Sequence, residues 1–521
     1  MKNEATAKGA DYWYEKRWIA LAFLGVSLLL ISLDNTILNV ALPSISRDLG
    51  TSASGLQWIL DSYVLVFAAM LLTMGSISDR IGRKRTLQLG LVVFGLCSLM
   101  AAFSTSTEML IAARALLGIG AAMIMPSTLS ILTATFRDPM ERAKAIAIWA
   151  TVFGLGMGFG PIIGGGLLEH WEWGSVFLIN IPVICAGLIG GYFFIQESKD
   201  DWAPKPDIPG VFLSITGLFS LVYGIIKAGE ESWTDGNVLI TLGFGVVLLT
   251  VFGFWERHAP HAMLPLKFFK NMSFTGANIA LTLVMFSVFS TFFFMTQYFQ
   301  SVQGYSPLKT GVLVFPMSLI SMFFAINSAR IAHKIGTKLT VSIGIFIAGC
   351  GLLYLSQVPG VDTSYWIIFI GLCVLPIGMG TAMSPATNSI MGSVPVNRAG
   401  VGSAMNDTTR QVGGALGIAI LGTIMNGVYL GKLGGLHEKL PMLTEEALDG
   451  IESSIQGAHQ FVEINGPNLD PQVVQTITET ADKAFVAGMT DALFVGGIIM
   501  IIAALVTLII LPSRVRPAQE D

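Results

Sequence analysis

The chain has 521 residues, of which 53% are hydrophobic and only 12% are charged, and its formal net charge is -4. A soluble protein of this length needs far more charge on its surface, so the composition indicates that a lipid bilayer surrounds most of the chain. The small net charge points to no nucleic-acid partner. The four cysteines lie in apolar segments without a CxxC pair, so we expect no disulfide, no metal site and no cofactor.

Apolar segments long enough to cross a bilayer, about 20 residues each, recur along the whole chain. We predict fourteen spans, near 18–43, 54–78, 86–104, 109–133, 142–168, 175–195, 208–228, 238–256, 273–302, 308–333, 338–357, 364–392, 400–429 and 484–512. The N-terminal segment lacks the short apolar core of a secretory signal, so insertion into the membrane must rely on the first span.

A short internal repeat suggests how the spans are grouped. The sequence DRIGRK at 79–84 follows the second span, and HKIGTK at 333–338 follows the tenth. If these turns are equivalent, two six-helix bundles cover 18–195 and 273–512, and the two spans within 208–256 are an insert between them. Two repeated bundles around a site at the membrane midplane are a common transporter design.

The distribution of basic residues predicts the orientation. Most of the 30 Lys and Arg, including Arg80 and Arg83, fall on one side of the membrane, and such an excess normally marks the cytoplasm. Residues 1–17 are then cytoplasmic, and an even number of spans returns residues 513–521 to the same side. We therefore expect a multi-pass protein of the plasma or inner membrane with both ends in the cytoplasm.

Four motifs carry a resemblance to a known family. They are the loop GSISDRIGRKR at 75–85, LDNTILNVALP at 33–43, Arg114 followed by GIGAA and Pro126, and GMGFGPIIGGG at 156–166. Together they resemble the fourteen-span drug:proton antiporters of the major facilitator superfamily. The resemblance implies an all-α major facilitator fold with two six-helix bundles and two inserted helices. It also implies a monomeric secondary transporter, not an enzyme, that exports multiple drugs and confers antibiotic resistance.

The loop at 75–85 is the first candidate for a conformational role. Gly75 and Gly82 permit close backbone approach, while Asp79, Arg80 and Arg83 supply charges at a tight turn. The resemblance implies a gate latch, in which Asp79 pairs with a nearby Arg and caps a helix of the other bundle. The alternative is a basic anchor that needs no partner.

The glycine-rich fifth span is the second candidate. Its glycines, among them Gly160 and Gly164, allow a close helix crossing, and Pro161 predicts a kink. This face is either the junction at which the two bundles slide, or ordinary tight packing inside one bundle.

Among the charged side chains inside predicted spans, Asp34, Asp61, Arg114, Asp407 and Arg410 stand out. A charge at the centre of a spanning helix costs at least about 2.5–3.5 kcal/mol, so each requires a reason. We expect the three aspartates to bind protons or cations, with the two arginines as their charge partners. Asp34, Asp61 and Arg114 could meet in one cavity, whereas Asp407 and Arg410, three residues apart on one helix, could simply pair with each other.

These groups suggest an exchange of protons for a lipophilic cation. Desolvation favours the protonated form of a carboxylic acid, and an arriving cation favours the charged form, so drug and proton compete. Aromatic and methionine side chains in the ninth span are weak candidates for the drug pocket, since they suit flat cations. They are Phe292, Met295, Gln297 and Tyr298.

One departure from the family bears on the substrate. In the branch that exports quaternary ammonium antiseptics, the resemblance implies further acidic residues where this chain has Ser321 and Gln411, and a glutamate where it has Asp407. Fewer carboxylates favour monovalent over divalent cations.

The segment 430–483, between the last two spans, is predicted to lie outside the cell. Thr444 and Asp470 are typical helix starts, so we expect two short amphipathic helices over the outer mouth. They form either a solvated cover or a part of the gate.

Other functional classes lack their usual sequences. The chain contains neither a GxxxxGK[ST] loop nor an HExxH motif, so ATP-driven transport and metalloprotease chemistry are not indicated. Export of an endogenous metabolite, lipid or peptide remains the alternative to drug export.

Overall fold

The fold was determined as a computed structural model, which describes residues 14–136, 138–199, 207–259, 266–394, 399–436, 440 and 443–513. Most of the described chain is helical, because a segment inside hydrocarbon must satisfy its backbone hydrogen bonds within itself. Fourteen helical segments in this part of the chain are long and apolar enough to cross a bilayer, which confirms the predicted number of spans. The predicted terminal segments, 1–17 and 513–521, lie almost wholly outside the described residues.

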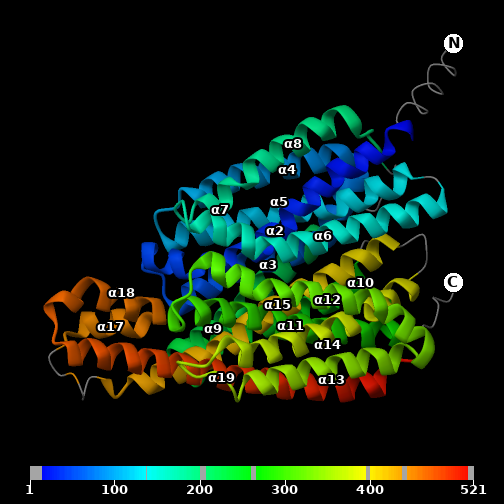
Figure 1. The fold of residues 1–521 in the computed structure, drawn as a ribbon. Helices are drawn as coiled ribbons and strands as arrows, with labels where there is room; N and C mark the ends of the chain where they lie inside the picture. Colours follow the sequence, from blue (N-terminus) through cyan, green and yellow to red (C-terminus); the bar gives the residue numbers. More distant parts are fainter. Residues whose placement is uncertain are drawn as a thin grey trace, which may run out of the picture.

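The first six spans form one bundle, drawn in blue and cyan in Figure 1. Within it α2 packs on α6 and α8, and α5 packs on α3 and α4. The helices are α2 (Arg17–Leu49), α3 (Ala53–Ile81), α4 (Arg83–Ala102), α5 (Thr107–Thr135), α6 (Pro139–Leu168), α7 (Ser175–Leu178) and α8 (Asn180–Phe194), of which α7 and α8 together make the sixth span.

The last six spans form a second bundle beside the first (Figure 1). Its strongest packing joins α13 to α14 and α19, and α11 to α15. Its helices are η1 (Leu266–Lys270), α11 (Met272–Gln297) with the π-helical turn η2 (Tyr298–Val302), α12 (Pro307–Ile335), α13 (Thr337–Leu355), α14 (Tyr365–Gly392), α15 (Ala399–Leu433) and α19 (Pro471–Ile510).

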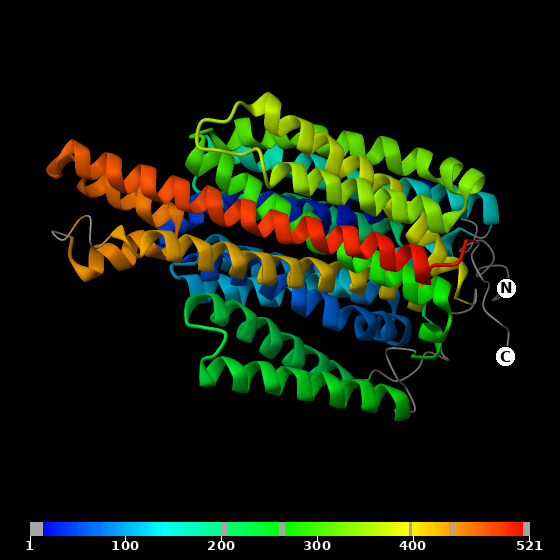
Figure 2. The same ribbon diagram turned by 90° about the horizontal axis from the view of Figure 1, so that it is seen from below.

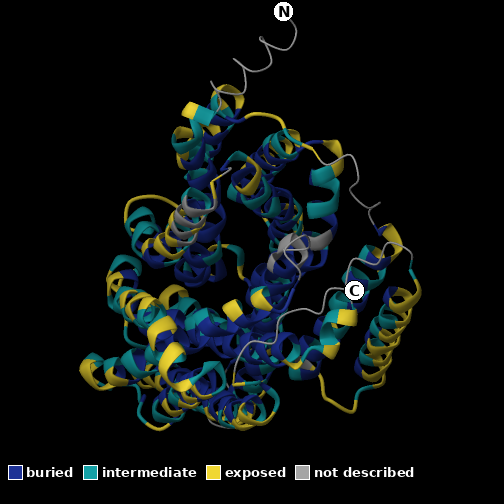
Figure 3. Cartoon of the chain, turned by 90° about the vertical axis from the view of Figure 1, so that its right-hand side faces the viewer, coloured by how far each residue is buried: buried dark blue, intermediate teal, exposed yellow. Residues whose placement is uncertain are grey.

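The two inserted helices, α9 (Ile208–Glu230) and α10 (Gly236–His258), lie against one side of this pair of bundles, as the green helices of Figure 2 show. Helix α9 packs on both α3 and α15, whereas α10 packs mainly on α9. The end-on view shows buried residues inside the bundles and exposed residues around the perimeter (Figure 3). Because the exposed side chains of α10 are large and apolar, including Ile240 and Phe254, lipid is their natural environment.

The two repeated turns have matching geometry. Gly82 has a φ of 119° and Gly336 a φ of 87°, a backbone conformation that favours glycine. In each turn the next residue donates its N–H to a carbonyl just beyond the last helix of the same bundle, over 2.9 Å to Ser198 and 3.0 Å to Ser513. The similarity of the two turns reflects the internal repeat, and their end of the molecule is called the turn end below.

The opposite end, called the hairpin end, carries α17 (Glu445–Ser453), α18 (Ile455–Asn465) and the short turn η4 (Gly466–Asn468) (Figure 1). Thr444 begins α17, as predicted, by accepting a hydrogen bond from the N–H of Ala447. Asp470 also begins a helix, but this helix is the 40-residue α19, which continues into the last span. The segment does contain two short helices, α17 and α18, but the predicted start of the second one at Asp470 was wrong. No proline or glycine interrupts the helix between 472 and the predicted start of the span, so the helix that begins at Asp470 is continuous with the last span.

Candidate functional site

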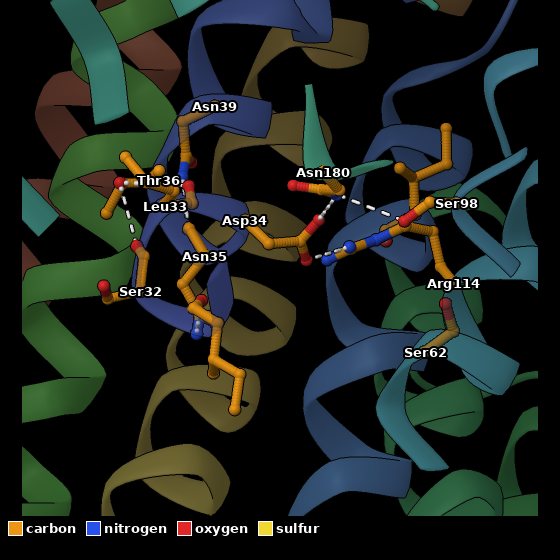
Figure 4. A network of polar contacts seen from close by, with 12 residues as sticks. Ser32, Leu33, Asp34, Asn35, Thr36, Asn39, Ser62, Ser98, Arg114 and Asn180 are labelled. Carbon is orange, nitrogen blue, oxygen red and sulfur yellow. Dashed lines mark hydrogen bonds and ion pairs between the residues drawn. The ribbon is translucent and has the colours of Figure 1, made fainter. Parts of the chain in front are cut away.

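A buried ion pair joins two of the charged residues singled out in the sequence. Nη1 of Arg114 on α5 lies 2.6 Å from Oδ2 of Asp34 on α2, and the side chains are 1% and 0% exposed (Figure 4). Nε of the same guanidinium donates to the carbonyl of Ile59, and its carbon lies 4.2 Å from the centre of the Tyr63 ring. Arg114 is thus held by a carboxylate, a carbonyl and an aromatic face, which together compensate its removal from water.

Asn180, the first residue of α8, completes this network. Its amide nitrogen lies 3.5 Å from Oδ1 of Asp34 and 3.1 Å from the hydroxyl oxygen of Ser98 (Figure 4). Asn180 is not among the site residues predicted from the sequence. The available signal was a single amide side chain inside the apolar sixth span.

A small cavity lies between the two bundles next to the ion pair. Helices α2, α3, α5 and α6 of the first bundle and α11 and α15 of the second line it. Its wall consists of Asn35, Asn39, Leu60, Val64, Arg114, Met157, Val288, Phe289, Phe292 and Ile418. The wall is therefore mainly apolar and aromatic, with two amides and one charged side chain, which is the usual make-up of a small-molecule pocket.

Asp61 lies apart from the ion pair, where α3 meets α15. It follows Gln57 by four residues, so both side chains lie on one face of α3, and Gln57 reaches across to Gly422 of α15. The Asp61 side chain is fully buried, and neither carboxyl oxygen has a hydrogen-bond partner among the described residues. Val64, three residues further along the same face of α3, lines the cavity, so this unpartnered carboxyl lies close to the pocket wall.

Asp407 and Arg410 do not form an ion pair with each other within the described part of the chain. Asp407 accepts a hydrogen bond from Asn406 over 3.2 Å, and Arg410 donates one to Thr387 of α14 over 3.1 Å. Thr387 in turn donates to the Asn406 side chain over 3.1 Å. The two charges are therefore linked through a polar chain between α14 and α15 instead of by direct contact.

The four pocket candidates of the ninth span separate into two groups. Phe292 lines the cavity, one turn from Phe289. Met295, Gln297 and Tyr298 are buried nearer the hairpin end of α11 and do not line it. There the Tyr298 hydroxyl donates to a backbone carbonyl in the loop before α14, and the Gln297 amide oxygen lies 3.3 Å from an amide nitrogen of α18.

The loop at the turn end is held within its own bundle. Asp79 accepts a hydrogen bond from Arg83 over 2.7 Å, one turn along the chain. Gly82 packs against the Glu197 carboxylate, which also accepts hydrogen bonds from the two N–H groups at the start of α4. Arg80 is exposed, and Gly75 faces α5 across an ordinary van der Waals distance. In this conformation the ion pair that Asp79 forms within the described residues is with Arg83 of its own loop.

The glycines of α6 face two different neighbours. A side chain at Gly160 or Gly164 would meet Thr36 or Ile37 of α2, inside the same bundle. A side chain at Gly165 would instead meet the backbone of Leu308 on α12, in the other bundle. The carbonyl of Pro161 also faces α12, at Gly311. Of the three conformational candidates in this helix, only Pro161 therefore lies at the junction of the bundles.

Several further contacts join the bundles at the hairpin end. The amide of Gln300 donates to the carbonyl of Val40 over 2.9 Å, and the hydroxyl of Ser306 donates to the Glu169 carboxylate over 2.6 Å. Helix α18 adds two contacts with the end of α2. The hydroxyl oxygens of Ser454 and Ser46 are 3.5 Å apart, and an amide of α18 donates to the carbonyl of Arg47 over 2.8 Å.

Comparison with known proteins agrees with this architecture. The model of the Major Facilitator Superfamily matches residues 24–418, which is more than half of the chain. The chain belongs to this superfamily. It is therefore a multi-pass membrane transporter and not an enzyme.

The chain is similar over nearly its whole length to several bacterial resistance proteins. The multidrug efflux pump LfrA of Mycolicibacterium smegmatis is 33% identical over 492 residues, covering 94% of this chain and 95% of LfrA. The tetracenomycin C resistance and export protein of Streptomyces glaucescens is 32% identical, covering 94% and 91%. The methyl viologen resistance protein SmvA of Salmonella typhimurium is 32% identical, covering 94% and 97%.

Solved transporter structures share the fold. A bacterial homologue of the human lysosomal transporter Spinster has a TM-score of 0.65 at 18% identity, covering 95% of this chain and 98% of that one. The human organic anion transporter MFSD10 has a TM-score of 0.54 at 13% identity, covering 93% and 99%. At these identities the similarity concerns the fold alone.

Proposed function

We propose that this protein is a proton-coupled antiporter that exports lipophilic, cationic drugs by alternating access. The observation that carries the proposal is a cavity between two repeated bundles, with Arg114 of a buried ion pair in its wall and a buried, unpartnered carboxyl among the described residues beside it. Intramembrane charges of this kind mark transport pathways and proton relays. The similar LfrA is a multidrug efflux pump and the similar SmvA a methyl viologen resistance protein, and both support export of cationic drugs. Methyl viologen is a dication, so the similarity to SmvA does not support the preference for monovalent cations expected from the sequence.

The orientation follows from the basic residues. The turn end carries Arg83, Lys84 and Arg85, so we assign it to the cytoplasm. The contacts between the bundles at the hairpin end then close the cavity from the outside. Export requires these contacts to break when the transporter opens outward.

The cavity wall suits an aromatic cation. Phe289 and Phe292 offer ring faces one turn apart on α11, and Asn35 and Asn39 on α2 offer amides. A cation over an aromatic ring gains about 0.5–2 kcal/mol, the upper value applying where water is excluded. Phe292→Leu keeps this part of the wall apolar but removes the aromatic ring. It should therefore weaken the binding of a quaternary ammonium dye more than the binding of an uncharged compound of the same shape.

Arg114 and the drug would compete for Asp34. Both are positively charged, and in this conformation the carboxylate is already bound to the guanidinium at 2.6 Å. A cation can therefore gain full access to Asp34 only if Arg114 moves aside. This competition makes Arg114 a positioning residue that prevents the carboxylate from holding the drug too tightly.

Asp61 is the better candidate for the transported proton. An ionised carboxylate without a partner in a dry interface costs several kcal/mol, so the closed α3–α15 contact favours the protonated acid. Loss of this proton to the cytoplasm would destabilise the closed contact and favour outward opening. A cation in the adjacent cavity favours that loss, because like charges repel.

The experiment is proton-driven uptake of ethidium into inverted membrane vesicles. Wild type should accumulate ethidium when the vesicle interior is acidified, and a protonophore should abolish the uptake. Asp34→Asn and Asp61→Asn should each lose proton-driven uptake when uptake is compared at equal amounts of inserted protein. Asp48→Asn, which makes the same change at the exposed end of α2, should transport like wild type.

Normal coupled uptake in both Asp34→Asn and Asp61→Asn would refute the proposed mechanism. Uptake that requires ATP and ignores the protonophore would refute antiport. If an uncharged compound of the same shape were transported as fast as ethidium, the proposed preference for cations would be wrong.

A further inference from the structure

The inserted helix α9 covers the place where the two bundles meet along α3 and α15. The Phe219 ring stacks on Trp58 of α3 with centroids 5.7 Å apart and planes inclined by 17°. On its other side, the carbonyl of Ile225 accepts a hydrogen bond from the Thr423 hydroxyl of α15 over 2.9 Å. A single helix is thus attached to both bundles, one contact being aromatic and the other a buried hydrogen bond.

Asp61 lies in the line of contact that α9 covers. It follows Gln57, which faces α15, by four residues and Trp58, which faces α9, by three. Residues at these spacings are neighbours on a helix surface. The Asp61 side chain therefore lies on the face of α3 between the side that contacts α15 and the side that contacts α9. The amide oxygen of Gln57 is also buried and has no hydrogen-bond partner among the described residues.

The surroundings of Asp61 contain little charge. No ion pair within 4.0 Å involves Asp61 in the described part of the chain. Besides Asp61, the titratable groups on the three helices packed there are Tyr63, Asp79 and Arg80 of α3, Tyr223, Lys227 and Glu230 of α9, and Asp407, Arg410, Tyr429 and Lys432 of α15. Asp79 and Arg80 lie at the turn end of α3, Lys227 and Glu230 at the last turn of α9, and Lys432 at the last turn of α15. The carboxyl therefore depends on exclusion of water, and α9 is the element that closes this side.

We propose that the inserted α9–α10 pair is a lateral seal for the proton-binding carboxyl of Asp61. Trp58, Phe219 and Thr423 are positioning residues that hold α9 against both bundles and keep water away from Asp61 unless the bundles move. This inference rests on the proposed function and assigns the inserted helices a part in it. Without the seal, water would enter along the loosened α9 interface from the membrane surfaces and reach Asp61 in either conformation, and protons would cross without a drug.

The test is the drug-free proton leak of purified protein in liposomes carrying an internal pH dye. Phe219→Ala removes the stacked ring, and Thr423→Val removes the hydroxyl with little change of shape. Each should raise the leak several-fold over wild type, and adding Asp61→Asn should return it to the wild-type level. Ile240→Ala, at a side chain of α10 that is 72% exposed, is the matched control and should not leak.

The outcomes separate this inference from the proposed function. A wild-type leak in both Phe219→Ala and Thr423→Val would overturn the seal, even if Asp61→Asn abolishes coupled transport. A leak that persists after Asp61→Asn would also overturn it, because the protons would then take another route. Coupled transport that survives Asp61→Asn alone would instead refute the proposed role of Asp61. Thermal unfolding of each variant identifies a leak caused by general loss of folding.

Discussion

Removing one partner of the Asp34–Arg114 pair leaves the other charge buried in a place that water does not reach. Both side chains are at most 1% exposed, and their atoms approach to 2.6 Å. Breaking a buried pair in this way costs about 3–5 kcal/mol, whereas removing both charges together is often close to neutral. We therefore expect Asp34→Asn and Arg114→Gln each to destabilise the protein by about 3–5 kcal/mol. The double variant should be more stable than either single variant.

The measurement is a double-mutant cycle on unfolding in detergent, which isolates the interaction between the two side chains. The control is the same cycle on Arg17 and Glu141, whose ion pair is 2.8 Å long but whose side chains are 18% and 31% exposed. Partly exposed pairs contribute about 0–1 kcal/mol, so that cycle should give a much smaller coupling energy. Because the contact distance is nearly the same in both pairs, the comparison tests the effect of burial on the coupling energy.

Drug transport by these variants should not follow their stability. The double variant Asp34→Asn with Arg114→Gln should fold and insert, yet fail to accumulate ethidium, because it has lost the carboxylate that binds the cation. If Asp34→Asn cost no more than Glu141→Gln, or if the double variant were less stable than both single variants, the reasoning about the buried pair would be wrong. Recovery of coupled transport in the double variant would show that the pair is purely structural.

Two further predictions concern the hairpin end. Cysteines replacing Ser46 and Ser454, whose hydroxyl oxygens are 3.5 Å apart, should form a disulfide that stops export until it is reduced. Cysteines replacing Thr51 and Thr107, whose hydroxyl oxygens are 2.8 Å apart within one bundle, should form a cross-link that does not stop export. Export unchanged by the first cross-link would show that α18 does not separate from α2. Burial, with the Asp449 carboxylate adding to it, raises the pKa of the Glu452 carboxyl, so ionisation of Glu452 opposes folding once the pH exceeds this raised value. Glu452→Gln should accordingly raise the melting temperature at pH 7 and leave it unchanged at pH 4, and an equal rise at both would contradict the assignment.

Local sequence was sufficient for the parts of the fold that depend on local physics. The spans follow from apolar length, since a bilayer requires about 20 apolar residues per helix. The turn at Gly82 and the start of α17 at Thr444 follow from backbone conformation and capping, which involve only neighbouring residues. Local sequence does not mark a helix boundary where no proline or glycine interrupts the chain, as the continuous α19 shows.

The sequence by itself determined a fourteen-span transporter of the major facilitator type and identified the charged residues inside its spans. Only the tertiary structure decided which of these charges meet. Asp34 and Arg114 are 80 residues apart and are joined by the packing of α2 against α5, while Asp61 is left without a partner and Asn180 completes the network. Apolar periodicity predicts that a side chain is buried. Which side chain it contacts depends on how helices distant in the sequence pack together, and local sequence does not contain that information.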